Sequence, residues 1–236
     1  MGTHGHARGL SGLGPATLNL KRPEPASRGR FITIEGGEGA GKTTQVRLLV
    51  AALERAGIPA RATREPGGTS GGEAIRRILL EGDSEKWDMI SEALLLLAAR
   101  KEHVVRLIAP SLAEGIWVVS DRFADSTLAY QGYGRGLSLE DLAMLHRFAL
   151  GSFAPDLSVI LDVPAETGLT RAAARGNVGD RFERLDRAFH ERLCQGFRKI
   201  AADDIARCAL VDGSRDQPTV QRAILDVVEE RLGVSL

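Results

Sequence analysis

The sequence predicts a three-layer α/β/α domain in which helices cover both faces of a five-stranded parallel sheet. Two observations support this prediction. Short apolar segments alternate with longer segments of helical periodicity, and no internal repeat or interdomain linker interrupts residues 30–236. Alternating strands and helices are typical of parallel sheets. A chain of 236 residues is also long enough to bury one large core.

The predicted strands are short segments rich in apolar residues, at residues 31–35, 60–63, 116–120, 157–161 and 209–211. Apolar residues at helical spacing predict helices at residues 43–56, 72–80, 89–113, 139–150, 180–201 and 220–232. In the first helix these positions are Val46, Leu49, Val50 and Leu53, and Gly57 follows as a stop signal. Parallel strands should gather their functional loops at one edge of the sheet, beyond their carboxyl ends.

Composition excludes several classes of function. The formal net charge is zero, which gives no reason to expect a polyanionic partner such as a nucleic acid. No apolar run is long enough to span a membrane; the longest candidate, residues 93–99, lies between Glu92 and Arg100. Two cysteines, Cys194 and Cys208, are too few for a disulfide framework, so we expect a reduced protein in the cytoplasm.

Residues 1–29 differ in composition from the rest and are rich in Gly, Pro and Arg. We expect a disordered N-terminal extension at residues 1–29 ahead of one folded domain at residues 30–236. An organelle-targeting peptide is the alternative, because arginines sit among leucines here. The glycines and prolines disfavour the amphipathic helix that such a peptide needs.

Residues 36–43 read G-G-E-G-A-G-K-T and fit the phosphate-binding loop (P-loop) pattern G-x-x-x-x-G-K-S/T. A predicted strand precedes the loop and a predicted helix follows it, which makes a chance glycine-rich turn a poor alternative. The glycines allow backbone N–H groups to surround an anion at the helix N-terminus. The expected ATP-binding residues are Gly36, Gly37, Glu38, Gly39, Ala40, Gly41, Lys42, Thr43 and Thr44. Lys42 should reach the β- and γ-phosphates, and Thr43 should bind Mg²⁺.

Arginines recur where a second phosphate group could bind, at Arg64, Arg100, Arg122, Arg171, Arg175, Arg181 and Arg184. Phosphoryl transfer to a phosphate acceptor requires such residues, because two polyanions must meet and charge spreads in the transition state. The sequence lacks the N-K-x-D motif of guanine-reading GTPases. An anionic acceptor needs no general base, so His103, His146 and His190 are most simply surface or packing residues.

Four stretches resemble bacterial-type thymidylate kinases, which are nucleoside-monophosphate kinases of the P-loop NTPase fold. They are residues 34–44, 64–69 (R-E-P-G-G-T), 121–132 and 155–164. The resemblance implies transfer of the ATP γ-phosphoryl group to dTMP, giving dTDP and ADP for dTTP synthesis, with Mg²⁺ and a homodimer of soluble subunits. Another nucleoside-monophosphate kinase, or a P-loop ATPase switch, remains the alternative.

The resemblance also implies roles for single residues. Asp121 should help Thr43 to position Mg²⁺, although a carboxylate after a strand can also cap a helix. Lys42 and Arg122 are the expected catalytic residues outside the lid. A carboxylate inside a P-loop is electrostatically unfavourable beside phosphates, and Glu38 is explained if it accepts a hydrogen bond from the sugar 3′-OH. The expected substrate-binding residues are Glu38, Arg64, Leu96, Arg100, Arg122, Ser126, Thr127, Tyr130 and Gln131.

Within this set, Arg122 and Arg64 should bind the acceptor phosphate, and Arg100 should read the thymine O4. Tyr130 should crowd the sugar C2′ and so disfavour ribonucleotides. Leu96 departs from the family, which usually has a phenylalanine there that stacks on thymine. Leucine lacks the aromatic contribution of roughly 0.5–1.5 kcal/mol, so we expect a weaker base site or an aromatic ring supplied from elsewhere.

The stretch 171–184 resembles the family's lid, with catalytic arginines at Arg171, Arg175 and Arg181. Gly176 and Gly179 would allow closure. One position that carries arginine in the family is Ala173 here, which leaves open which lid arginine reaches the transferred group. A helix and loop with a solvated basic face is the alternative. Residues 212–214 could form the edge of the adenine pocket.

Overall fold

The predicted strands form one parallel sheet in a computed structural model of the chain. The structure describes residue 1 and residues 28–83, 86–174 and 181–236. The strands are β1 (Phe31–Gly36), β2 (Ala60–Arg64), β3 (Trp117–Asp121), β4 (Leu157–Asp162) and β5 (Cys208–Asp212). They lie in the order β2-β3-β1-β4-β5, and all neighbouring pairs are parallel. The predicted fold class is therefore confirmed, with β1 at the centre.

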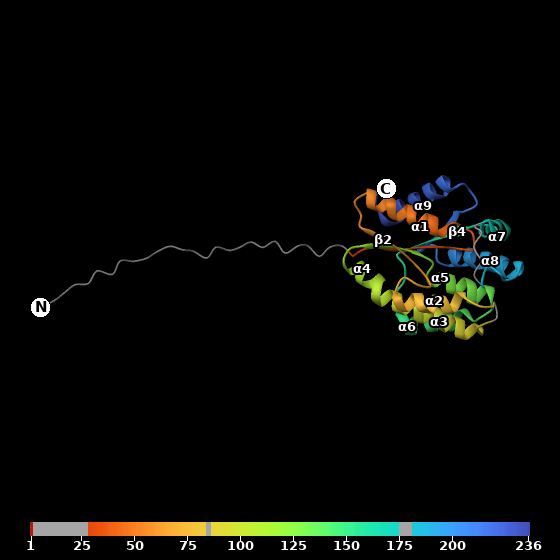
Figure 1. The fold of residues 1–236 in the computed structure, drawn as a ribbon. Helices are drawn as coiled ribbons and strands as arrows, with labels where there is room; N and C mark the ends of the chain where they lie inside the picture. The colour runs from red at the N-terminus through yellow and green to blue at the C-terminus, as the bar shows by residue number, and fades with distance from the viewer. Residues whose placement is uncertain (2–27, 84–85, 175–180) are drawn as a thin grey trace.

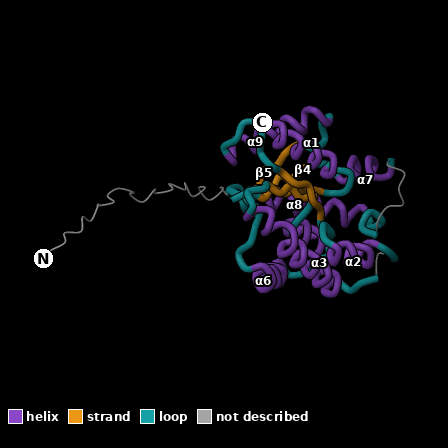
Figure 2. The backbone as a smooth tube through the Cα atoms, turned by 60° about the vertical axis from the view of Figure 1, so that its left-hand side comes forward, coloured by secondary structure: helices purple, strands orange, loops and turns teal. Residues whose placement is uncertain are grey.

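Helices cover both faces of this sheet (Figure 1). The helices are α1 (Lys42–Arg55), α2 (Ser70–Leu80), α3 (Met89–His103), η1 (Val104–Ile108), α4 (Ala109–Ala113), α5 (Ala124–Thr127), η2 (Leu128–Gly134), α6 (Leu139–Leu150), α7 (Ala165–Ala173), α8 (Arg187–Asp203) and α9 (Gln217–Leu232). One layer contains α1 and α9, and α8 lies across the sheet from them with α3 and α6 further out (Figure 2). Both η segments are π-helical.

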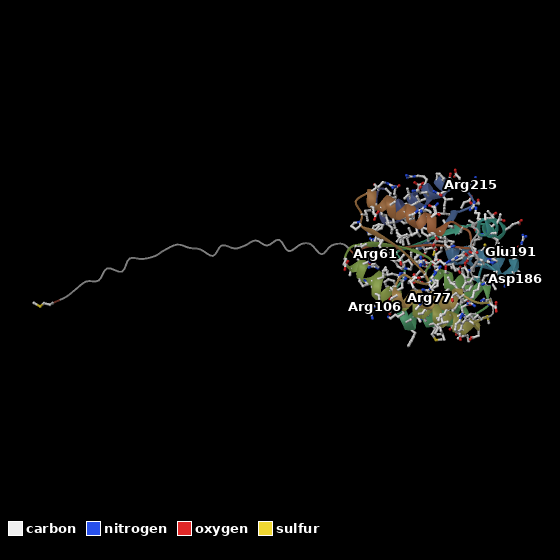
Figure 3. All side chains as sticks on the ribbon, in the orientation of Figure 1. Arg61, Arg77, Arg106, Asp186, Glu191 and Arg215 are labelled. Carbon is white, nitrogen blue, oxygen red and sulfur yellow. The ribbon has the colours of Figure 1, made fainter. Side chains whose placement is uncertain are left out.

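The core is apolar on both faces of the sheet. Ile32, Ile34 and Val159 pack with residues of α1 and α9 on one face. On the other face, Ile160 packs against aromatic residues of η2 and α8. Exposed charged side chains such as Arg106 and Arg215 extend outward from the surface (Figure 3). No helix among the described residues is long and apolar enough to cross a membrane.

Most predicted helices are present, with two differences in their form or bounds. The predicted helix 89–113 is one continuous path, but residues 104–108 are π-helical. The helix predicted from residue 180 begins at Arg187, because the Asp186 carboxylate accepts a hydrogen bond of 2.6 Å from the Phe189 N–H. Residue 180 itself, like residues 2–27 of the expected N-terminal extension, lies outside the described residues.

Two helical segments were not predicted, residues 124–134 and 165–173. The first is largely buried, so it lacks the alternation of polar and apolar faces that a surface helix shows. It also approaches α8 closely: a Cβ on Gly134 would lie 2.5 Å from the Phe189 ring, and one on Gly196 would lie 2.7 Å from the Tyr133 Cβ. Glycines that serve close packing do not predict a helix in the sequence.

A buried polar network connects α5 with the sheet. The Arg207 guanidinium donates to both oxygens of Asp125 at 2.7 and 3.0 Å, and to Ser158 Oγ at 2.7 Å. Ser158 in turn contacts Thr33 of β1 at 2.9 Å. The Asp125 side chain is only 3% exposed, so this carboxylate depends on Arg207 for its counter-charge.

We predict that Arg207→Met lowers the free energy of unfolding by about 3 kcal/mol, because Asp125 is left buried and unpaired. Urea denaturation measures the change. Arg222→Met is the matched control, since the Arg222–Asp226 pair is solvent-exposed and should contribute nothing measurable. Equal destabilisation of the two variants would contradict a structural role for the Arg207 network.

Candidate active site

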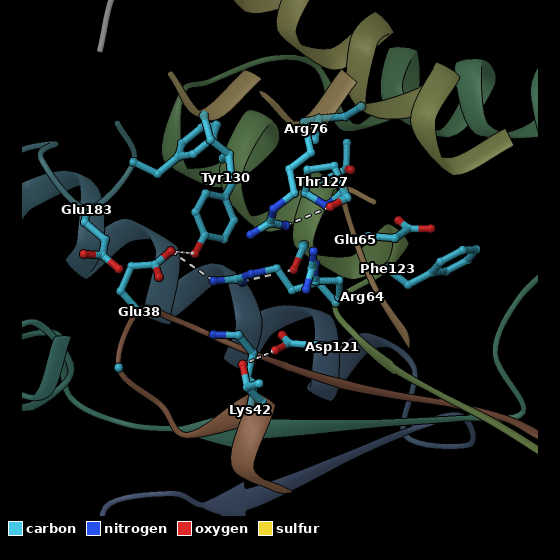
Figure 4. Close-up of a pocket in the computed structure, with 18 of the residues that line it drawn as sticks. Glu38, Lys42, Arg64, Glu65, Arg76, Asp121, Phe123, Thr127, Tyr130 and Glu183 are labelled. Carbon is cyan, nitrogen blue, oxygen red and sulfur yellow. Dashed lines mark hydrogen bonds and ion pairs between the residues drawn. The ribbon is translucent and has the colours of Figure 1, made fainter. Parts of the chain in front are cut away.

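A cavity of about 460 Å³ contains most of the predicted site residues (Figure 4). It is formed by the P-loop, the segments that follow β2 and β3, α3, η2 and part of α7. The predicted residues that line it are Glu38, Gly39, Gly41, Lys42, Thr43, Thr44, Arg64, Leu96, Arg100, Asp121, Arg122, Ser126, Thr127, Tyr130, Gln131 and Arg171. Gly36, Gly37 and Ala40 belong to the same loop but do not line the cavity. The structure therefore brings the P-loop and the residues predicted to bind the acceptor around one cavity.

The P-loop conformation explains its glycines. Gly39 and Gly41 have φ of +65° and +92°, and α1 begins directly afterwards at Lys42. A Cβ on Gly39 would lie 1.9 Å from the Gly168 carbonyl oxygen, so no larger residue fits there. Lys42 Nζ donates to the Gly37 carbonyl at 2.6 Å and so lies across the loop. These contacts present a cation and helix-terminal N–H groups to the same space.

Asp121 and Thr43 lie together at the edge of the sheet. Thr43 Oγ1 donates to the Asp121 carboxylate at 2.5 Å. The alternative role of Asp121 as a helix cap is not observed, because α5 begins at Ala124 and Phe123 occupies its N-cap position. Arg64 is the β2 residue paired with Asp121 in the sheet, and its guanidinium forms a 3.0 Å ion pair with Glu73.

Glu38 is surrounded by groups that favour its charged form. It accepts hydrogen bonds from Arg122 Nη2 at 3.0 Å and from the Tyr130 hydroxyl. Burial works to raise the pKa of Glu38, but the charges of Arg122 and Lys42 outweigh it and lower that pKa to about 2. Glu38 is therefore a fixed carboxylate near neutral pH. Burial and the positive charge of Arg122 lower the pKa of Lys42 to about 8.

Arg122 occupies a strained position that neighbouring groups stabilise. It is the one non-glycine residue with positive φ among the described residues, at +73°. Its Nη1 donates to the Gly36 carbonyl at 2.8 Å, and its guanidinium lies 4.8 Å from the centre of the Tyr130 ring. Arg122 therefore contacts the P-loop and η2 at the same time.

Glu35 at the end of β1 holds the segment that follows Arg122. Its carboxyl group accepts hydrogen bonds from the Phe123 N–H at 2.7 Å and from Ser126 Oγ at 2.6 Å. Burial, together with Asp125, raises the pKa of Glu35 to about 8. Glu35 was not among the predicted site residues, although a lone carboxylate inside an apolar strand was a signal.

Arg100 is buried, so it is not a solvated helix arginine. Its Nε donates to Glu65 at 2.7 Å, and its Nη2 donates to Thr127 Oγ1 at 2.8 Å. His103 is also fully buried and contacts Glu65, so of the two expected roles, surface and packing, the surface role is wrong. Glu65 lies inside the R-E-P-G-G-T stretch, and that motif was the available signal for its importance.

Leu96 and Gln131, which we expected to contact the base, line the cavity, and Phe182 also lines it. Gln131 Nε2 donates to Glu92 at 2.7 Å, while its buried Oε1 has no hydrogen-bond partner among the described residues. Phe182 packs edge-on against Tyr130, with ring centres 5.6 Å apart. Sequence reasoning gave no signal for Phe182.

The three predicted lid arginines differ in where they lie relative to the cavity. Arg171 lines the cavity and donates to the carbonyls of Gly213 and Ser214, each at 2.8 Å. Arg175 lies outside the described residues. Arg181, which we expected near the transferred phosphoryl group, does not line the cavity. Arg181 is fully buried, forms an ion pair with Glu92 and donates a hydrogen bond to the Leu79 carbonyl at 2.6 Å. It lies there because Glu92 supplies the counter-charge that a buried guanidinium needs.

Comparisons with known proteins agree with this geometry. A family model described as thymidylate kinase matches residues 34–224. A thymidylate kinase from Caulobacter vibrioides is 49% identical over 208 residues, covering 88% of this chain and 100% of that protein. One from Bradyrhizobium sp. (strain BTAi1) is 48% identical over 219 residues, covering 92% of this chain and 96% of that protein.

A solved structure is also similar. The crystal structure of thymidylate kinase from Ehrlichia chaffeensis aligns with a TM-score of 0.69 at 34% identity, covering 85% of this chain and 99% of that one. The family model and these relatives extend across the P-loop, the R-E-P-G-G-T stretch and the segment after β3. The chain belongs to the thymidylate kinase family.

Proposed function

We propose that this chain transfers the γ-phosphoryl group of ATP to dTMP, producing dTDP and ADP. Its family membership and one structural observation support the proposal. Arg122 of the acceptor side forms an ion pair with Glu38 inside the P-loop, at 3.0 Å. This contact supports two substrate sites around one cavity, as direct transfer between the substrates requires.

On the ATP side, Lys42 and the P-loop N–H groups would bind the β- and γ-phosphates. Mg²⁺ would bind near Thr43 and Asp121, whose oxygens lie 2.5 Å apart. Oxygen donors of this kind, completed by phosphate oxygens, suit Mg²⁺. Among the described residues no group of three or more His, Cys, Asp or Glu could hold a metal alone. Bound Mg²⁺ would neutralise phosphate charge as it develops.

On the dTMP side, Arg122 would hold the acceptor phosphate with Ser126 beside it, and Arg64 would add positive charge. Glu38 would accept a hydrogen bond from the 3′-OH, which requires the carboxylate that its low pKa maintains. Arg100 would read the thymine O4, with Thr127 at the base edge. The unpartnered Gln131 Oε1 could accept a hydrogen bond from the thymine N3–H. Tyr130, held by Glu38, would lie against the sugar C2′.

The chemistry then needs positioning more than acid–base catalysis. An oxygen of the dTMP phosphate attacks the γ-phosphorus, and the bond to the β-phosphate oxygen breaks to release ADP. Lys42 and Arg122 stabilise the charge on the transferred group. Arg171 is the described lid arginine that lines the cavity, and it would act there together with Arg175, whereas Arg181 would first have to leave its pocket.

The active form would be a homodimer in the cytoplasm. Its interface would involve α3 and α6, which contact each other and carry exposed apolar side chains. These are Ile90, Leu94, Met144 and Phe148, and Phe148 is 90% exposed.

The direct test measures ADP formation with ATP, Mg²⁺ and one acceptor at a time. We expect turnover with dTMP and at least tenfold lower kcat/KM with AMP, CMP and GMP, since a pocket that hydrogen-bonds one base rejects others by about this much or more. ATP hydrolysis without an acceptor, and no dTDP product, would contradict the proposal. The acceptor dUMP isolates the contribution of the thymine methyl group.

Replacing Leu96 by phenylalanine tests the base site. We expect Leu96→Phe to lower the KM for dTMP about threefold to tenfold, because a stacked ring adds roughly 0.5–1.5 kcal/mol. The KM for ATP should not change. An unchanged or raised KM for dTMP would mean that leucine, or another ring such as Phe182, already fills this role.

The pKa of Lys42 predicts a pH dependence of ATP binding. The protonated form binds phosphate, and it is lost above pH 8 in the free protein, where the pKa of Lys42 is about 8. Bound phosphates raise the pKa of Lys42. ATP affinity should therefore fall by up to about tenfold per pH unit between the pKa of the free protein and the higher pKa of the ATP-bound protein. Calorimetric titrations between about pH 7.5 and 9.5 measure the effect. Lys42→Met should bind ATP weakly and lose this dependence; persistence of the slope would assign it to another group.

A further inference from the structure

We propose that Glu65 and His103 are positioning residues for base recognition, because together they fix the orientation of the Arg100 guanidinium. The inference rests on the proposed role of Arg100 in reading the base and adds two residues to it. Neither has been given a function above. Glu65, Phe123 and Thr127 lie on the same side of the cavity, away from Glu38 and Glu183 (Figure 4).

The Arg100 guanidinium is held along two of its edges. Its Nε donates to Glu65 Oε2 at 2.7 Å, and its Nη2 donates to Thr127 Oγ1 at 2.8 Å and to the Phe123 carbonyl at 3.0 Å. Its Nη1 is the nitrogen that has no hydrogen-bond acceptor among the described residues. Arg100 lines the cavity while only 4% exposed, so this edge is the part of the cation left for a ligand.

His103 holds the other oxygen of Glu65. His103 Nδ1 lies 3.0 Å from Glu65 Oε1, and His103 Nε2 lies 2.7 Å from Thr63 Oγ1. An ionised carboxylate can only accept, so Nδ1 carries the proton in this contact. The resulting chain of hydrogen bonds runs from Thr63 through His103 and Glu65 to Arg100. All three of His103, Glu65 and Arg100 are buried.

The local backbone is built to accommodate this chain. Arg100 and His103 are three residues apart on α3 and so share a helix face. The π-helical segment η1 starts immediately after His103, and π-turns recur at functional sites. Gly68 has φ of +80°, and a Cβ there would lie 2.5 Å from His103 Nε2. Gly68, the second glycine of the R-E-P-G-G-T stretch, therefore leaves room for the His103 ring.

The arrangement affects recognition as well as stability. If His103 no longer donates, Glu65 Oε1 becomes a buried carboxylate oxygen without a partner, which is costly. The carboxylate would then turn or admit water, and the plane of the Arg100 guanidinium would no longer be fixed. A donor aimed at position 4 of the base favours a carbonyl there and disfavours an amino group. If the Arg100 guanidinium loses its fixed orientation, discrimination between dTMP and dCMP should therefore decrease.

Two substitutions of His103 separate these roles. In His103→Asn the amide nitrogen can take the place of Nδ1 and keep the hydrogen bond to Glu65. In His103→Gln it can take the place of Nε2 and keep only the contact with Thr63. We expect His103→Gln and Glu65→Gln to raise the KM for dTMP about tenfold and to lower the dTMP to dCMP ratio of kcat/KM, with the KM for ATP unchanged. His103→Asn keeps the contact with Glu65 and loses only the contact with Thr63, so it should raise the KM for dTMP about threefold.

Three controls make the outcome decisive. His146→Ala removes a helix histidine that bonds to the Phe153 carbonyl at 3.0 Å outside the cavity, so it should lower the Tm without changing the KM for dTMP. Thr63→Val removes only the last hydrogen bond, and it should raise the KM for dTMP about threefold even if the His103 variants fold poorly. Arg100→Ala tests the underlying assignment directly.

The possible results distinguish the two claims. If Arg100→Ala leaves the KM for dTMP unchanged, the proposed role of Arg100 fails. If Arg100→Ala raises that KM but His103→Gln, Glu65→Gln and Thr63→Val do not, the positioning role fails and the role of Arg100 stands. Equal effects of His103→Asn and His103→Gln, or parallel changes in the KM for ATP, would reduce His103 to a structural residue.

Discussion

The ion pair between Arg122 and Glu38 is the interaction on which the active site depends. Glu38 belongs to the P-loop after β1, and Arg122 follows β3, the neighbouring strand. The pair therefore joins the P-loop to the segment that we propose binds the acceptor phosphate. Arg122 reaches this position only with φ of +73°, a conformation that is unfavourable for residues other than glycine. Its contacts with Gly36, Glu38 and Tyr130 compensate for that strain.

Charge balance in the cavity follows from this pair. Glu38 remains a carboxylate because Arg122 and Lys42 outweigh the effect of burial on its pKa. The same concentration of positive charge, together with burial, lowers the pKa of Lys42. The cavity thus carries one internal anion among its cations. Glu38 holds Arg122 in place by an ion pair, and in the proposed function it also accepts a hydrogen bond from a sugar hydroxyl.

The fold could be predicted from the sequence to a large extent. Each predicted strand matches the observed one within a residue at either end. For most of them the local signal is an apolar, β-branched run between polar turns. Residues 124–134 were missed for the opposite reason. Their helix is surrounded by protein, and contacts with Phe189 and Tyr133 across the interior decide its packing. The spacing of apolar residues within the segment itself does not reveal those contacts, so it does not predict the helix.

In the candidate site, too, some features could be predicted from the sequence and others could not. The P-loop and its flanking strand and helix are contiguous in the chain, so the sequence was enough to predict a phosphate-binding loop that contains Lys42 and Thr43. The surroundings of each arginine, in contrast, depend on the tertiary structure. It paired Arg181 with Glu92 in a buried pocket, and it held Arg100 with Glu65, a residue 35 positions away. The cause is electrostatic: a buried cation takes its role from the acceptors around it, and folding brings those acceptors from distant segments.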